Sequence, residues 1–101
     1  MDTEPVADPV STDPDLYRVI FENARVRVLE YLDRPGTRTH EHHHPDSVAV
    51  TLSAFHRLVT ENGQPREVDL DAHRALWLPA QDHTGENIGG TPTHVIFVEL
   101  K

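Results

Sequence analysis

The chain has 101 residues, no cysteine and a formal net charge of −8 at pH 7. This length predicts one domain with one modest core, and the lack of cysteine excludes disulfides and thiolate metal ligands and favours a cytoplasmic protein. The acidic balance, and apolar runs far shorter than the roughly 20 residues of a membrane span, argue against nucleic-acid and membrane partners.

The first fifteen residues are acidic and rich in proline, with little apolar content. A segment of this composition buries too little surface to offset the entropy lost on ordering. We therefore expect residues 1–15 to form a flexible arm and residues 16–101 to form the folded domain.

Short segments with the composition of β-strands follow one another along the rest of the chain. They are rich in β-branched and aromatic residues, and turn sequences such as Pro35-Gly36 and Asn62-Gly63 separate them. The expected strands are residues 16–21, 24–32, 47–53, 58–60, 67–70, 75–79 and 93–100. No segment of ten residues has a convincing 3.6-residue apolar period, so the sequence predicts an all-β domain, most simply a single antiparallel jelly-roll β-barrel.

Residues 39–48, with the sequence THEHHHPDSV, contain half of the histidines in the chain. Because side chains alternate between the two faces of a strand, an extended segment would place His40, His42 and His44 on one face and His43 on the other, in solvent. Neutral imidazole is the common nitrogen ligand of Zn, Fe, Cu and Ni. On residue type alone, a metal site and a solvated surface cluster both remain open.

Two spaced motifs resemble those of the cupin superfamily. In the first, Gly36 is followed after five residues by His42 and after one more residue by His44. In the second, which spans residues 79–87, a proline-led turn is followed by His83 and, after three further residues, by asparagine. The resemblance extends over the expected domain and implies the double-stranded β-helix of that superfamily, which fixes a fold far better than a function.

The resemblance also implies a ligand set, in which His42, His44 and His83 hold a metal inside the barrel. The usual fourth ligand of the family is a glutamate a few residues after the second motif histidine, and Ser47 or Val48 occupies that place here. Motif glycines are also replaced, at residues 54, 73 and 81.

Three accounts of the missing carboxylate are open. A three-histidine site could hold the metal with water and leave positions for a substrate; His40 could supply the fourth ligand; or the histidines could line a polar pocket without metal. If a metal binds, histidine ligands favour a divalent transition metal (Zn, Fe, Ni, Mn or Cu) over calcium and magnesium, which prefer oxygen.

These features favour a metal-dependent enzyme for a small molecule, of isomerase, lyase or dioxygenase type. The alternative is a non-catalytic module that binds or senses a small ligand, with or without metal. We expect a homodimer, because edge strands and a low apolar content both favour a partner. His94 shares its strand face with Ile96 and Val98, so we expect it to face the barrel interior.

Overall fold

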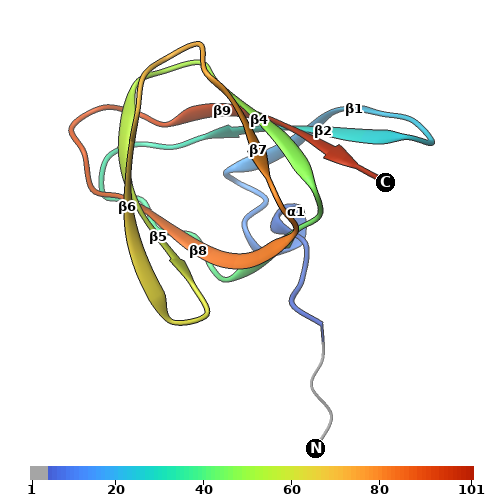
Figure 1. The fold of residues 1–101 in the computed structure, drawn as a ribbon, viewed down its shortest axis with the longest axis horizontal. Coiled ribbons are helices and arrows are strands. Elements are labelled where there is room, and N and C mark those ends of the chain that lie inside the picture. Colours follow the sequence, from blue (N-terminus) through green and yellow to red (C-terminus); the bar gives the residue numbers. More distant parts are fainter. Residues whose placement is uncertain (1–4) are drawn as a thin grey trace, which may run out of the picture.

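The computed structural model describes residues 5–101, which form a short N-terminal helix followed by nine β-strands (Figure 1). The elements are α1 (Pro9–Thr12), β1 (Tyr17–Glu22), β2 (Val26–Leu32), β3 (His42–His44), β4 (Ser47–Thr51), β5 (Phe55–Glu61), β6 (Gln64–Leu70), β7 (Ala75–Leu78), β8 (Gln81–Asn87) and β9 (His94–Leu100). No helix among these residues is long and apolar enough to cross a membrane.

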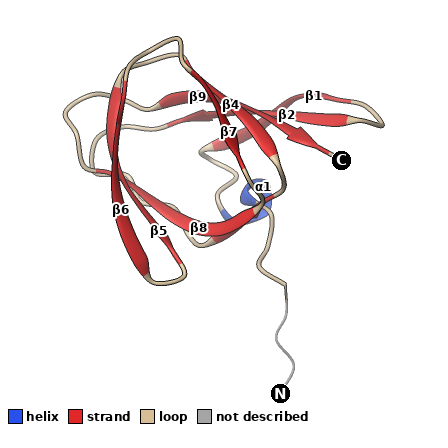
Figure 2. Ribbon diagram, viewed as in Figure 1, coloured by secondary structure: helices blue, strands red, loops and turns tan. Residues whose placement is uncertain are grey.

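The strands form two antiparallel sheets that face each other (Figure 2). One sheet has the order β1-β2-β9-β4-β7, and the other has the order β3-β8-β5-β6. Consecutive strands pair in β1–β2 and β5–β6, whereas β2 pairs with β9 and β3 with β8, strands that are distant in the sequence. The prediction of an all-β antiparallel jelly-roll barrel is confirmed.

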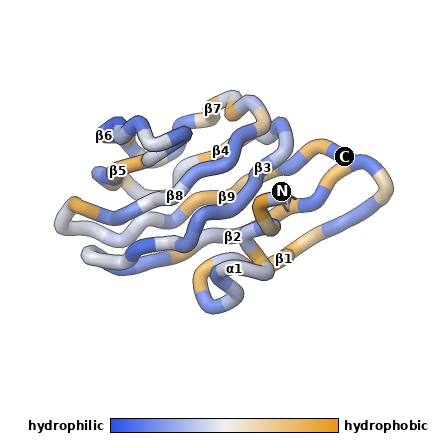
Figure 3. Tube along the Cα trace, turned by 90° about the horizontal axis from the view of Figure 1, so that it is seen from below, coloured by the Kyte–Doolittle hydropathy of each residue, from blue (hydrophilic) through white to orange (hydrophobic). Residues whose placement is uncertain are grey.

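The apolar core lies between the sheets and is small. Leu29 on β2 is fully buried opposite Phe97 on β9, and Phe97 also lies opposite Ala49 on β4. Apolar and hydrophilic residues alternate along much of the chain rather than gathering in one long run (Figure 3). Truncating Leu29 to alanine would cost about 2–5 kcal/mol, the usual range for a buried leucine.

Many of the buried side chains are polar, and they lie around the barrel interior. They are Asp13, Asp33, Thr39, His42, His44, Ser47, Thr51, Arg57, Asn87, Thr93 and Glu99. Burying a polar group without a partner is costly, and nearly all of these groups have hydrogen bonds within the protein. This polar interior explains how so acidic a chain folds around so few apolar residues.

The two motifs meet at one end of the barrel. Gly36 has a φ of 88°, a left-handed conformation that favours glycine. From this turn its N–H donates to the Asn87 carbonyl at 2.9 Å, and the Asn87 N–H donates back to the Thr37 carbonyl at 2.9 Å. Motif residues fifty positions apart are thereby joined through the backbone.

The N-terminal segment differs from the flexible arm that its composition predicts. From residue 5 onward it packs on the barrel: Asp8 pairs with Arg27, Asp13 is buried, and the His43 N–H donates to the Ala7 carbonyl at 2.8 Å. The acidic residues that suggested a solvated arm therefore have specific partners on the barrel. Residues 1–4 lie outside the described part of the chain, and the boundary at residue 16 stays a prediction.

The expectation that His94 faces the interior is wrong. On β9 the buried residues are Val95, Phe97 and Glu99, whereas His94 lies on the outer face with its Nε2 atom 2.8 Å from Glu30. Both faces of β9 carry apolar residues, so the sequence alone does not show which face is inward. The face that contains the charged Glu99 would be expected to point outward, but it is the buried one.

Candidate metal centre

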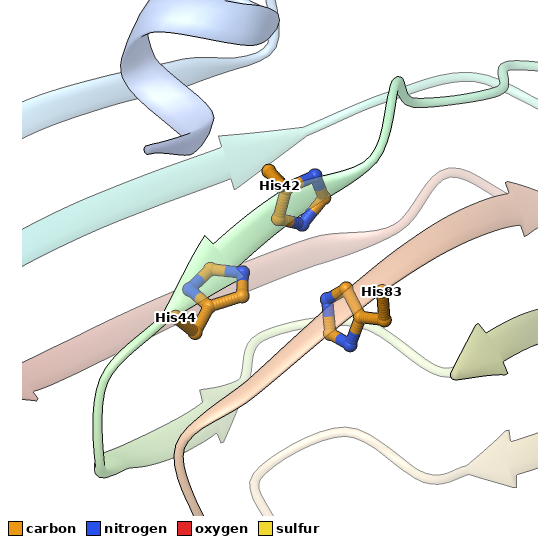
Figure 4. Close-up of side chains that lie close together, drawn as sticks. All are labelled: His42, His44 and His83. Carbon is orange, nitrogen blue, oxygen red and sulfur yellow. The ribbon is translucent and has the colours of Figure 1, made fainter. Parts of the chain in front are cut away.

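Three histidines from two adjacent strands point toward one another inside the barrel (Figure 4). His42 and His44 lie on the same face of β3, and His83 on β8 is the direct cross-strand partner of His42. The ring centroids are 4.8 Å apart for His42–His44 and His42–His83, and 5.1 Å apart for His44–His83. One nitrogen of each ring lies within 4.8 Å of the others, as in a metal-binding group.

His42 is held by backbone and by a tyrosine. Its Nδ1–H donates to the His40 carbonyl at 2.8 Å, so Nε2 carries the lone pair and accepts from the Tyr17 hydroxyl at 3.3 Å. Burial, with a smaller contribution from the neighbouring His44, lowers the pKa of His42 to about 4. The ring is therefore neutral at pH 7.

His83 is oriented by a side-chain amide. The Gln81 amide nitrogen donates to the Pro79 carbonyl at 3.0 Å, which turns the amide oxygen toward His83. His83 Nδ1–H donates to that oxygen at 2.8 Å, and Nε2 is again the free nitrogen. Burial, followed by the nearby His44 and His42, lowers the pKa of His83 to about 3.

His44 is fully buried and bonded to a carboxylate. Its Nδ1–H donates to Glu99 Oε2 at 3.0 Å, while Glu99 Oε1 accepts from Arg27 Nε at 3.0 Å and from Arg27 Nη2 at 2.8 Å. Its ring stacks on Phe97 with centroids 4.8 Å apart. His44 Nε2 is the one buried side-chain polar atom of residues 5–101 without a hydrogen-bond partner.

The three rings share one arrangement that fits a metal ion. Each Nδ1–H is bonded to an acceptor, which fixes the tautomer and leaves three Nε2 lone pairs in the same region. Metal-ligating histidines characteristically donate their second nitrogen in this way to a carboxylate or carbonyl. An unsatisfied buried nitrogen is costly to a fold, and a metal bound at Nε2 would remove that cost for His44.

A carboxylate reaches this site from β9 rather than from the position that the motif resemblance predicts. Ser47, in the expected glutamate region, is fully buried and donates to the Pro45 carbonyl at 2.6 Å. Its cross-strand partner on β9 is Glu99, whose carboxylate bonds to the ring of His44. Sequence reasoning missed Glu99, although a lone charged residue within an apolar strand near the end of the chain is a usable signal.

The structure does not bring His40 into the group. Its side chain is 80% exposed, and its Nδ1 atom lies 2.9 Å from Asp13. The extended strand β3 begins only at His42, and the buried Asp13 accepts from the backbone N–H of His40 and pairs with its ring. His43 points out of the barrel as expected, with Nδ1 2.7 Å from Asp82.

A cavity of about 360 Å³ lies beside the histidines, with His42 and His83 in its wall. The cavity is large enough for a small organic molecule. Its wall is mostly apolar, with Phe55, Val95 and Phe97 among the lining residues. A ligand in this cavity would lie next to an ion held by the three rings.

Several solved structures share this architecture. A cupin domain from Bordetella pertussis superposes with a TM-score of 0.79 at 25% identity, over 85% of this chain and 92% of that one. The chain belongs to the cupin superfamily. A double-stranded β-helix protein from Klebsiella pneumoniae (TM-score 0.67, 21% identity, 84% and 75% coverage) and a cupin superfamily protein from Desulfitobacterium hafniense (0.63, 18%, 84% and 75%) share the fold. The sequence matches no protein-family model and no curated relative.

The cupin fold accounts for the position of the three histidines. It pairs the strand of the first motif with the strand of the second, which sets His42 opposite His83. This cupin departs from the family pattern at the fourth ligand, and its second motif replaces a glycine with Gln81, whose amide oxygen orients His83.

Proposed function

We propose that this cupin holds one divalent transition metal through Nε2 of His42, His44 and His83 and uses it on a small molecule bound in the barrel. The observation that carries the proposal is the set of three anchored Nδ1–H groups, which leaves three Nε2 lone pairs, one of them buried without a partner. Nitrogen ligands suit Zn, Fe, Ni, Mn or Cu.

The metal would supply Lewis acidity toward an oxygen of the bound molecule. The residues of the chain prepare the site for it. The low pKa values of His42 and His83 keep both rings neutral at pH 7, so the ion displaces no proton from these two nitrogens. Glu99 accepts from His44 Nδ1–H and so orients its ring, as the carboxylate partners of metal-ligating histidines commonly do.

The geometry favours an enzyme over a binding module with a closed metal shell. Catalytic sites commonly keep three protein ligands and an exchangeable position, whereas structural sites are closed by a fourth. His40 points into solvent, Ser47 bonds to the backbone, and the cavity lies against His42 and His83. Isomerase, lyase and dioxygenase chemistry are all compatible with this arrangement.

Elemental analysis of protein purified without a nickel column tests the proposal. We expect about one equivalent of a transition metal in the wild type and almost none in His83→Ala. The matched control is His43→Ala, which removes an exposed imidazole from the same strand and should leave the metal content unchanged.

Metal well below one equivalent in the wild type, even after incubation with excess Zn²⁺ or Mn²⁺, would contradict the proposal. So would equal metal content in the wild type and His83→Ala. A substrate screen with oxygen consumption and carbonyl-isomerisation readouts then separates the reaction classes in protein that does hold metal.

We also propose that two copies pair through the outer face of the five-stranded sheet. An apolar row crosses all five strands there, and the register sets its members side by side: Phe21, Val28, Val98, Val48 and Trp77. Phe21 and Trp77 are 54% and 56% exposed.

Light scattering should give a dimer for the wild type and a monomer for Val48→Lys. A monomeric wild type would contradict the proposed dimer. A cytoplasmic location stays a prediction.

A further inference from the structure

Two arginines share the cavity with the histidines. Arg57 on β5 and Arg66 on β6 both line it. Arg57 lies opposite Asn87 on β8, and Arg66 lies opposite Val59, which is itself opposite Gly85. Residues 83, 85 and 87 share one face of β8, so Arg57 lies two steps of about 7 Å along the strands from His83 and one strand across, and Arg66 lies one step along and two strands across.

The guanidinium of Arg57 is buried and keeps a donor free. Its Nη1 atom donates to Asp33 at 2.5 Å and to Thr93 at 3.1 Å, and Nη2 donates to the Tyr31 hydroxyl at 3.2 Å. The residue is 8% exposed, and these three bonds leave its Nε–H and one Nη2–H without a hydrogen-bond partner in the described part of the chain. A guanidinium has five N–H donors, and three hydrogen bonds do not exhaust them.

Asp33 neutralises part of this charge but lies behind the arginine. Its carboxylate also accepts from Tyr31, from the Asn87 amide at 2.9 Å and from the Thr93 N–H at 3.0 Å. It does not line the cavity. Four groups therefore share the charge of Asp33, whereas Arg57 lines the cavity with two N–H donors that have no partner among these groups.

The charged residues in the cavity wall favour an anion. They are the two arginines and Glu67, whose side chain is 66% exposed and lies 3.5 Å from His56. The carboxylates of Asp13 and Glu99 lie behind the histidines, bonded to rings or to Arg27. Arg66 is exposed like Glu67, so the buried guanidinium of Arg57 is the charged group of the wall that is placed to attract an anionic ligand.

Gly85 gives the guanidinium its place between His83 and Asn87. A Cβ atom at residue 85 would lie 2.7 Å from Arg57 Nη2 and 3.5 Å from Nε. A side chain at residue 85 would therefore require the guanidinium of Arg57 to shift.

We propose that the small molecule bound in the barrel carries a carboxylate that accepts a hydrogen bond from the free Nε–H of Arg57, with its other end directed toward the three histidines. A planar guanidinium binds a carboxylate through short charge-assisted hydrogen bonds. The part of this inference that concerns the histidine end rests on the proposed function; the arginine end does not.

NMR of the Arg57 side chain tests the inference on the full-length protein. Buried arginine Nε–H groups give resolved signals, and Arg57→Lys assigns this one. We expect the signal to shift on titration with succinate and to stay in place with succinamide, its neutral diamide. The titration is made on metal-free and on Zn²⁺-loaded protein.

Binding measured by calorimetry gives the second readout. Arg57→Lys should weaken succinate binding to Zn²⁺-loaded protein at least tenfold without changing the metal content. Arg18→Lys, an arginine 73% exposed on β1, is the matched control and should bind as the wild type does. An Arg57 signal that does not move with succinate, or that moves equally with succinamide, would overturn the inference.

The experiments distinguish failure of the proposed metal site from failure of the proposed carboxylate site at Arg57. If the wild type holds no metal, the proposed function is lost, while the Arg57 signal in metal-free protein still decides the carboxylate site. If succinate binds equally tightly to wild type and to Arg57→Lys while both hold metal, the proposed function survives and the arginine site does not.

Discussion

The barrel contains two buried polar clusters that satisfy their hydrogen bonds to different extents. Around Asp33, both carboxylate oxygens accept two hydrogen bonds each, from Arg57, Tyr31, Asn87 and Thr93. Around the histidines, each Nδ1–H is satisfied and His42 Nε2 accepts from Tyr17, but the buried His44 Nε2 has no partner within residues 5–101. The carboxylate of the first cluster is fully satisfied, although Arg57 keeps free N–H donors, whereas the second cluster leaves a buried nitrogen of His44 that a ligand can satisfy.

Because of this difference in hydrogen bonding, we expect the Asp33 cluster to contribute to stability and the histidine cluster to contribute to ligand binding. A satisfied network holds a unique packing, and its disruption should affect folding more than metal content. An incompletely satisfied group lowers stability until its partner binds, because whatever binds only the native state stabilises it. Variants in the two clusters should therefore give opposite patterns of stability and metal content.

The largest expected effect is from Asp33→Ala. Removing this carboxylate leaves the buried guanidinium of Arg57 without its counter-charge, which typically costs about 3–5 kcal/mol. Urea unfolding should show this loss, while the metal content of the folded protein stays near one equivalent. Asp82→Ala, at an exposed carboxylate beside His43, should change the free energy of unfolding by no more than about 0.5 kcal/mol. A loss below 1 kcal/mol for Asp33→Ala would mean that the network is not the structural element described above.

Acid should destabilise the histidine cluster first in metal-free protein. The pKa of His42 falls from an ordinary 6.5 to about 4, and that of His83 to about 3, so between these values and pH 6.5 the unfolded state binds more protons than the folded one. The contribution of these histidines to the free energy of unfolding should be constant above pH 6.5. It should decline as the pH falls toward 4, by about 3 kcal/mol for His42 alone.

Urea titrations at a series of pH values check this decline. His42→Gln should flatten the part of the curve between pH 6.5 and 4.5, above the range in which ordinary carboxylates titrate. An unchanged slope in that variant would show that His42 titrates normally in the folded protein.

A smaller effect is expected from Glu99→Gln. The amide still accepts a hydrogen bond from His44 but carries no charge, and loss of such a partner commonly weakens metal binding about 10–100-fold. Competition with a chromophoric chelator measures the affinity. Glu30→Gln is the matched control, because Glu30 bonds to a histidine on the outer face, His94, and should leave the metal affinity unchanged. Equal affinities for Glu99→Gln and wild type would remove Glu99 from the metal site.

The prediction of the fold succeeded because it needed only the types and spacing of residues. Alternating apolar residues and frequent turns are enough to predict an antiparallel β-barrel, and the spacing of Gly36, His42 and His44 was enough to suggest the family. The positions of His42 and His44 on one face of β3 follow from the period of two residues in any strand.

The rest depended on which face of a strand is inward and on contacts distant in the sequence. On β2 and β9 both parities are apolar, and the sequence prediction for β9 placed the face of Val98 inward, whereas Leu29 and Phe97 are the buried residues. The role of Glu99 depends on its pairing opposite Ser47, and the position of His40 depends on a carboxylate 27 residues earlier. No local pattern encodes these pairings.

Tyr17→Phe should give the smallest effect and has a definite sign. In metal-free protein the Tyr17 hydroxyl donates to His42 Nε2 at 3.3 Å, which is the lone pair that an ion would take. Loss of this hydrogen bond should cost metal-free protein about 0.5–1.5 kcal/mol. In the variant the metal no longer has to displace this hydrogen bond, so metal affinity should rise by the corresponding factor of about 2–10.

Tyr31→Phe is the matched control. Tyr31 is also buried, but its hydroxyl bonds to Asp33 and Arg57, so loss of this hydroxyl should lower stability and leave metal affinity unchanged. Weaker metal binding in Tyr17→Phe would mean that the hydroxyl supports the metal-bound state instead, and Tyr17 would then belong to the metal site rather than compete with the ion for His42 Nε2.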